Sequence, residues 1–166
     1  MFAQAVIDSL EFARTEQTVH GVLPISSLAR LQDSLHDAAG HVEIIVRGGK
    51  DAQWRPVLNV TITGALHLRC QRCLGRLEYP VRVENTLLLV TQADADGEEF
   101  DELEADSIVA SRELNVAELV EDELILSLPY SPRHAEGECA QQATAANASA
   151  ESTPFAKLAE LKKSHH

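Results

Sequence analysis

The sequence predicts an α+β protein, an antiparallel β-meander with a long central hairpin and with helices packed on one face of the sheet. Apolar and polar side chains alternate over most of residues 58–70 and again over most of 77–89, which is typical of half-buried strands. The short intervening segment, 71–76, joins the two strands as a hairpin. Residues 115–128 instead repeat apolar side chains at helical spacing, which predicts a helix that covers the apolar face.

The length and composition favour one folded unit with polar extensions. A chain of 166 residues with 45% apolar and 24% charged residues fits a single globular domain. We expect one α+β domain over residues 1–139. Residues 140–153, rich in alanine and small polar residues, are predicted to form a disordered tether. Residues 154–166 are predicted to form a short helix and a tail.

The N-terminal part of the domain predicts a helix and then a strand. Pro24 suits the first position of a helix, and Gly40 suits its end. Between them, apolar residues recur at helical spacing: Ile25, Leu28, Leu31 and Leu35. Alternation over residues 42–46 predicts the next strand, and the glycines of 48–51 predict the turn that follows it.

The C-terminal part of the domain predicts a short strand within residues 107–114 and then the covering helix. Asn115 and Glu118 have the spacing of a helix N-cap and its partner, and Pro129 ends the helix. The buried stripe of this helix is predicted to be Val116, Leu119, Val120 and Leu124. Its solvated face is predicted to be Glu118, Glu121, Asp122 and Glu123.

The negative charge is concentrated in one segment. The chain has a net charge of −12, and eight acids and no base lie between Asp94 and Asp106. Because such a run repels itself, we expect a solvated, disordered loop over residues 93–106. The overall charge excludes a protein that coats naked nucleic acid, since such proteins displace counterions with Lys and Arg.

The sequence also indicates the compartment. No apolar run approaches the ~18 residues that span a bilayer. Acids such as Asp8 and Glu11 stand where a signal peptide requires an unbroken apolar segment. We therefore expect a cytoplasmic protein that does not contact a membrane, whose three cysteines serve as thiols or metal ligands rather than as disulfides.

The cysteines suggest a zinc site. Cys70 and Cys73 lie at the predicted hairpin turn, where two thiolates two residues apart can bind one tetrahedral Zn²⁺. His134 and Cys139 can supply the second pair of ligands, which makes a Cys₃His set. The alternative interpretation is a turn with free cysteines, with Cys70 in phase with the core face of its strand.

Two further interpretations concern the same turn. A thiol–disulfide pair would benefit from Arg72, which can lower a thiol pKa, but such pairs open a helix, whereas this one joins two strands. A basic patch lies at the hairpin tip: His67, Arg69, Arg72, Arg76 and Arg82. Of these, Arg69, Arg72 and Arg76 are predicted to contact RNA or a partner protein. The alternative for this patch is a solvated strand face with charge pairs to Glu78 and Glu84.

Ordered blocks of the sequence resemble the YceD-like large ribosomal RNA accumulation proteins. The blocks are the turn at residues 70–74 with Tyr79, Pro80 and Val81 after it, the helix at 118–129, the residues Pro132, His134 and Cys139, and the terminal segment at 154–163. The resemblance implies a bacterial cytoplasmic factor needed for the synthesis, processing or stability of large-subunit ribosomal RNA. It implies no catalytic residues.

The functional hypothesis is a non-enzymatic factor that acts through a protein partner. A basic protein of the large subunit or of its processing machinery would be attracted to the acidic run at 94–106 and to the acidic face of the helix at 115–128. Contact with ribosomal RNA would then be secondary. The alternative is a zinc-dependent or thiol-active enzyme, an oxidoreductase or a nuclease, built on Cys70 and Cys73.

Overall fold

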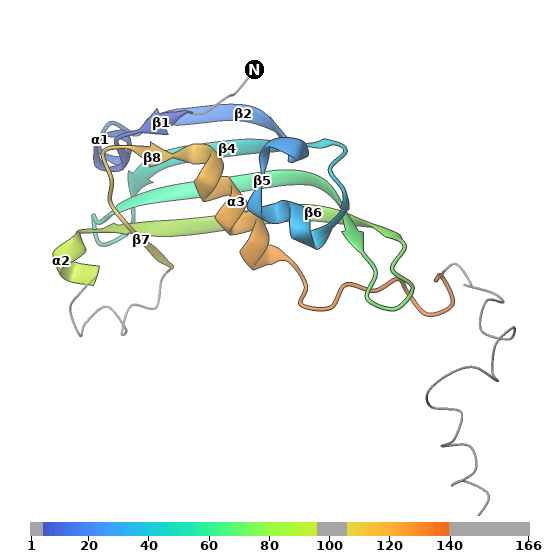
Figure 1. The fold of residues 1–166 in the computed structure, drawn as a ribbon. Helices are drawn as coiled ribbons and strands as arrows, with labels where there is room; N and C mark the ends of the chain where they lie inside the picture. Colours follow the sequence, from blue (N-terminus) through green and yellow to red (C-terminus); the bar gives the residue numbers. More distant parts are fainter. Residues whose placement is uncertain (1–4, 96–105, 140–166) are drawn as a thin grey trace, which may run out of the picture.

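The computed structural model describes residues 5–95 and 106–139, and it confirms the α+β class (Figure 1). Strands β2, β4, β5, β6 and β7 form one sheet in that order, β3 pairs with β5, and β1 and β8 form a separate two-stranded sheet. Helix α3 and the 3₁₀ helices η1 and η2 lie on one face of the large sheet. The elements in chain order are β1 (Val6–Ile7), α1 (Ser9–Arg14), β2 (Thr18–Pro24), η1 (Ile25–Ser27), η2 (Arg30–Ser34), β3 (Leu35–Asp37), β4 (His41–Lys50), β5 (Pro56–Arg69), β6 (Arg76–Val90), α2 (Gln92–Ala95), β7 (Ser107–Val109), β8 (Leu114–Asn115) and α3 (Val116–Ser127).

The long hairpin of β5 and β6 has the predicted antiparallel pairing. Ile62 lies opposite Val83 on β6 and Ile44 on β4, and its side chain is fully buried. Thr61 and Thr63 alternate with it and point to the other face of the sheet. The even-numbered apolar residues of β5 all belong to the core: Leu58, Val60, Ile62, Leu66 and Leu68.

The single helix predicted after Pro24 is wrong, because the structure has two short 3₁₀ helices followed by strand β3. Ile25, Leu28 and Leu31 are buried as predicted. Their three-residue spacing matches the 3.0-residue period of a 3₁₀ helix as well as it matches an α-helix. Gln32 Nε2 donates to the carbonyl oxygens of Ile25 and Leu28, at 2.8 and 2.7 Å, and so satisfies groups that an α-helix would have used.

The turn predicted at residues 48–51 lies further along the chain. Strand β4 continues to Lys50, and the turn is closed by Asp51, whose Oδ1 accepts from the amides of Gln53 and Arg55 at 2.9 and 2.8 Å. Gly48 serves packing instead. A Cβ atom at Gly48 would collide with the carbonyl oxygen of Phe12 in α1.

Helix α3 begins and ends as predicted. The Asn115 side chain accepts a hydrogen bond from the amide of Ala117 at 3.0 Å, and Asn115 Nδ2 donates to Glu118 Oε1 at 2.9 Å. The helix ends at Ser127, two residues before Pro129. The predicted apolar stripe is buried: Val116, Leu119, Val120 and Leu124.

The predicted solvated face of α3 is wrong for two of its four acids. Glu121 and Glu123 are each 6% exposed. Glu121 Oε1 accepts from the amides of Arg30 and Leu31 at 2.6 and 3.1 Å, and its Oε2 accepts from Arg30 Nε at 3.0 Å. The first amides of a 3₁₀ helix need an acceptor, and this carboxylate supplies it for η2. Glu123 accepts from Asn85 Nδ2 at 2.9 Å.

The remaining predictions fall partly outside the described residues. The short strand predicted within 107–114 is present as β7, which runs parallel to β6. Strand β8 begins at the last residue of this range, Leu114, and pairs with β1. Residues 93–95 belong to α2 rather than to the predicted acidic loop. Positions 96–105, the tether at 140–153 and the segment at 154–166 lie outside the described residues. No helix in the described ranges is long and apolar enough to cross a membrane.

Candidate metal centre

Cys70 and Cys73 lie in the tight turn between β5 and β6, here called the hairpin tip (residues 70–75). The Cys70 amide donates to the Gly75 carbonyl at 3.0 Å, and the Leu74 amide donates to the Cys70 carbonyl at 2.9 Å. Leu74 adopts a left-handed conformation, with φ of 59°. The Arg72 amide is 3.4 Å from Cys70 Sγ and donates to it. The turn therefore folds around the Cys70 sulfur, with its backbone donors directed at that atom.

The second pair of residues comes from the segment after α3, here called the C-terminal strap (residues 128–139). The Gln71 amide of the hairpin tip donates to the Pro132 carbonyl at 2.8 Å, which fixes the strap beside the tip. His134 Nε2 donates to the Arg76 carbonyl at 2.9 Å. These two bonds bring His134 and Cys139 to the cysteines of the turn, although some 60 residues separate the two segments.

The four predicted ligands converge on one point. One ligand atom from each of Cys70, Cys73, His134 and Cys139 lies within 4.8 Å of the other three. Cys70 Sγ is 3.9 Å from Cys139 Sγ, and His134 Nδ1 is 3.4 Å from Cys73 Sγ and 3.8 Å from Cys139 Sγ. A tetrahedral zinc ion with ordinary bond lengths has edges of about 3.8 Å between sulfurs and about 3.6 Å between sulfur and nitrogen. The cluster therefore has dimensions that can hold a metal ion.

The orientation of His134 suits a ligand. Because the Arg76 carbonyl can only accept, the proton of the imidazole lies on Nε2, which leaves Nδ1 facing the sulfurs of Cys73 and Cys139. Histidines that bind metals are commonly oriented by such a bond from their other ring nitrogen. This orienting carbonyl belongs to strand β6, and nothing in the sequence pattern around His134 indicates it.

The electrostatics of the cluster also favour a cation. Burial acts to raise the pKa of the Cys70 thiol, but hydrogen bonds from the backbone amides of Cys73, His134 and Arg72 outweigh it and lower this pKa to about 5. Burial and the neighbouring thiols of Cys73 and Cys70 raise the pKa of Cys139 to about 11. The Arg76 carbonyl and the Cys70 thiol raise the pKa of His134. A metal ion would displace protons from Cys139 and His134, so its affinity should increase with pH.

The geometry is unlike that of a redox or open catalytic centre. Redox thiol pairs of the thioredoxin type begin a helix, whereas Cys70 and Cys73 join two strands. A catalytic zinc site keeps one position open for water, whereas here the described residues offer four ligands, which complete a tetrahedron. The arrangement can therefore hold an ion that ties the strap to the hairpin tip.

The structure places the three predicted arginines around the same tip. Arg69 and Arg76 lie directly opposite each other at the last pair of the hairpin, and Arg72 lies within the turn. All three are exposed. Contact with RNA or with a partner stays a prediction for these residues.

Two residues contact Arg76: His67, which the sequence placed in the basic patch, and Asp37, which the sequence prediction did not include. His67 Nδ1 is 2.6 Å from Asp37 Oδ1, and Arg76 Nη2 is 2.6 Å from His67 Nε2. Since a guanidinium can only donate, His67 carries its proton on Nδ1 and donates it to Asp37. The bonds from His67 and from the Ala39 amide lower the pKa of Asp37 to about 2. Asp37 comes from β3, a strand that the sequence pattern did not indicate.

Comparisons with known proteins match most of this chain. A family model described as "Large ribosomal RNA subunit accumulation protein YceD" matches residues 58–162. A Haemophilus influenzae protein named "Large ribosomal RNA subunit accumulation protein YceD" is 26% identical over 167 residues, which cover 95% of this chain and 94% of that protein. No solved structure gives a significant match. The matched family region contains the hairpin tip and the C-terminal strap, with all four residues of the cluster.

Proposed function

Because the chain belongs to the YceD family of large ribosomal RNA subunit accumulation proteins, we propose that it is a non-enzymatic cytoplasmic factor acting through a basic protein partner. Family membership implies a role in the accumulation of large-subunit ribosomal RNA and so in ribosome biogenesis. The proposal specifies this role as support for the synthesis, processing or stability of that RNA. The observation that carries it is the family match, which extends over residues 58–162.

The ligand number of the Cys70, Cys73, His134 and Cys139 cluster supports a non-enzymatic role. Four side chains that can saturate a tetrahedral ion leave no position for a reacting water molecule. The remaining alternative, a thiol-active or zinc-dependent enzyme, predicts insulin reduction or RNA cleavage by the purified protein. We expect neither activity above background.

The metal is proposed to be zinc with a structural role. Three cysteines and one histidine are a donor set typical of structural zinc sites. The ion would connect the C-terminal strap to the hairpin tip. The large core cluster does not include the four residues, so the ion should stabilise this end of the molecule more than the sheet itself.

Purified protein is expected to contain about one equivalent of zinc, and removal of the ion should release the strap. Chelation should increase amide hydrogen exchange at residues 130–139 and should lower the melting temperature by a few degrees, because binding energy contributes to folding energy. Cys73→Ser should have the same effect, whereas Ser131→Ala, an exposed change in the strap, should retain zinc. Metal analysis that finds no zinc after reducing, chelator-free purification would leave Cys70 and Cys73 as residues of an ordinary turn.

The basic partner is proposed on grounds of charge. The acids concentrated at residues 94–106 attract basic proteins and repel bare RNA. Helix α3 contributes less than its sequence suggests, because only Glu118 and Asp122 of its four central acids are exposed, and Asp122 is paired with Arg30 at 2.6 Å. The acidic run is therefore the main element proposed to capture the partner.

Neutralising part of the acidic run should weaken partner capture without affecting folding. The test variant changes Glu98, Glu99, Asp101 and Glu102 to their amides. The matched control changes four exposed acids elsewhere in the chain, Glu16, Asp33, Glu43 and Glu113. After RNase treatment of the lysate, wild type and control should recover the same basic large-subunit or processing proteins. The test variant should recover several-fold less, in proportion to the lost attraction.

The cellular readout tests the function itself. In cells that lack this protein, wild type and the control should restore the amount of large-subunit ribosomal RNA relative to small-subunit RNA, and the test variant should restore less of it. Equal recovery of partners by the test variant and the control would contradict the role of the acidic run. Failure of the wild type to change the amount of large-subunit RNA would contradict the proposed function.

A further inference from the structure

We propose that the hairpin tip binds the phosphate backbone of ribosomal RNA through Arg69, Arg72 and Arg76, here called the tip arginines. This proposal rests on the proposed function, and it assigns the RNA contact to one end of the sheet. The contact is a local one on an acidic protein, so it would position the factor on RNA rather than recruit it from a distance.

The first observation is a pair of like charges at the end of the hairpin. Arg69 of β5 and Arg76 of β6 are directly opposite each other in the antiparallel register, so their side chains share one face of the sheet. Like charges in this position destabilise a hairpin. An anion between the two guanidinium groups would remove this repulsion, and a phosphate suits the planar, forked geometry of arginine.

The second observation is that Arg76 is held in place. Its Nη2 donates to His67 Nε2 at 2.6 Å, and its Nε is 3.7 Å from Asp37 Oδ2. Asp37 and His67 are themselves joined at 2.6 Å. Arg76 nevertheless keeps a side chain that is 53% exposed. A guanidinium that is already oriented loses less conformational entropy when it binds a ligand.

The third observation is that the positive charges of Arg69 and Arg72 are not neutralised by any described residue. Within the described residues, neither the Arg69 nor the Arg72 guanidinium has a hydrogen-bond or ion-pair partner. On this face of the sheet, Asp37 contacts Arg76, Glu84 pairs with Arg82 at 2.6 Å, and Glu78, which lies opposite His67, forms no ion pair among the described residues. The alternative predicted from the sequence, a strand face neutralised by charge pairs, therefore describes Arg82, which pairs with Glu84, but not Arg69 and Arg72.

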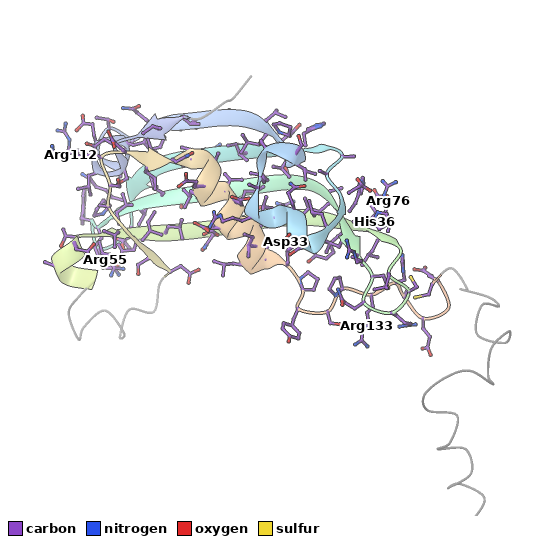
Figure 2. All side chains as sticks on the ribbon, in the orientation of Figure 1. Asp33, His36, Arg55, Arg76, Arg112 and Arg133 are labelled. Atoms are coloured by element: carbon purple, nitrogen blue, oxygen red, sulfur yellow. The ribbon has the colours of Figure 1, made fainter. Side chains whose placement is uncertain are left out.

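The position of the tip also favours access by a large ligand. Arg76 and His36 lie together at one end of the molecule in Figure 2, whereas Arg55 and Arg112 lie at the opposite end. The tip is bordered by the C-terminal strap, which the hydrogen bonds from Gln71 to Pro132 and from His134 to Arg76 hold beside it. An RNA backbone can therefore approach the tip arginines at an exposed end of the sheet.

The strength and salt dependence of the contact follow from the number of charges. Three phosphate contacts give a slope of log K against log salt of about −2 to −3. Because the chain carries a net charge of −12, binding should be weak and should disappear near physiological salt when no protein partner is present. A contact of this strength is consistent with a basic protein as the main partner.

The test measures binding of a fluorescently labelled RNA hairpin to the full chain by anisotropy at low salt. The variant Arg69→Gln/Arg72→Gln/Arg76→Gln should bind at least about tenfold more weakly than wild type and should lose the salt slope. The matched control is Arg14→Gln/Arg47→Gln/Arg112→Gln, which removes three exposed charges away from the tip. It should bind nearly as well as wild type. Melting temperatures of both variants should confirm that each is folded, since exposed ion pairs contribute little to stability.

Each result separates this proposal from the proposed function. Equal weakening by the tip variant and the control would show that only net charge matters, and it would overturn the tip site. Unchanged binding by the tip variant would overturn it as well. In either case the wild type could still restore large-subunit RNA in cells that lack the protein. If the wild type failed to restore that RNA while the tip variant still lost RNA binding in solution, the proposed function would fail and the phosphate contact would remain.

Discussion

Replacement of Ile62 by aspartate is expected to abolish cooperative folding of the domain. Ile62 is fully buried in the middle of β5, between Ile44 and Val83 on the two neighbouring strands. The change removes about 2–3 kcal/mol of apolar burial and places a carboxylate where no polar partner is available, which costs several kcal/mol more. The sum is comparable to the whole stability of a domain of this size, about 5–15 kcal/mol. Loss of the unfolding transition in circular dichroism would confirm it.

The adjacent position is the control. Thr63→Asp introduces the same charge one residue further along β5, on the opposite face of the sheet, between Glu43 and Arg82. Its cost should be below about 1 kcal/mol, because the side chain remains in contact with solvent and its two charged neighbours have opposite signs. Equal effects of the two substitutions would contradict the register of the hairpin, since a shift of one residue exchanges the two faces.

Replacement of Glu121 by alanine is expected to destabilise the protein by about 2–4 kcal/mol. The substitution leaves the amides of Arg30 and Leu31 without an acceptor at the start of η2, and Leu31 is fully buried. Unsatisfied buried donors retain their full desolvation cost. Urea unfolding should show a lower midpoint at an unchanged slope, because the fold itself is retained.

Two companion variants separate the hydrogen bonds of Glu121 from its charge. Glu121→Gln keeps an oxygen that can accept from both amides and removes the ion pair with Arg30, so its effect should be intermediate. Asp122→Ala removes an exposed ion pair from the same arginine and should cost less than about 1 kcal/mol. If Asp122→Ala lowered the free energy of unfolding as much as Glu121→Ala, the predicted contribution of the hydrogen bonds from the η2 amides to Glu121 would be contradicted.

The elements predicted correctly are those whose signals are local. Alternation of apolar and polar residues over 58–70 and 77–89 specified two strands and the main apolar face of each. Asn115 with Glu118 specified the start of α3, because a cap acts within one turn of the chain. The four residues that lie close enough together to hold a metal ion, Cys70, Cys73, His134 and Cys139, could be named from residue types.

The elements predicted wrongly are those whose outcome depends on a distant partner. The apolar spacing of Ile25, Leu28 and Leu31 fits two kinds of helix, and Gln32 is part of what determines which kind forms. Gly48 has the appearance of a turn residue, but the close approach of α1 explains it. A sequence pattern shows which side chains of a helix or strand are apolar. It does not show which distant segment of the chain packs against them.

Residue patterns alone therefore established the fold class, the central hairpin, the covering helix and the residue types of the candidate metal site. Only the tertiary structure decided that Glu121 is buried as an acceptor for η2 and that Asp37 and His67 hold Arg76. It also decided that the strap reaches the hairpin tip, through the bonds from Gln71 to Pro132 and from His134 to Arg76. The reason is physical. Buried polar groups form hydrogen bonds with whichever donors and acceptors the folded chain brings within about 3 Å. These partners are often far apart in the sequence, so local periodicity does not indicate them.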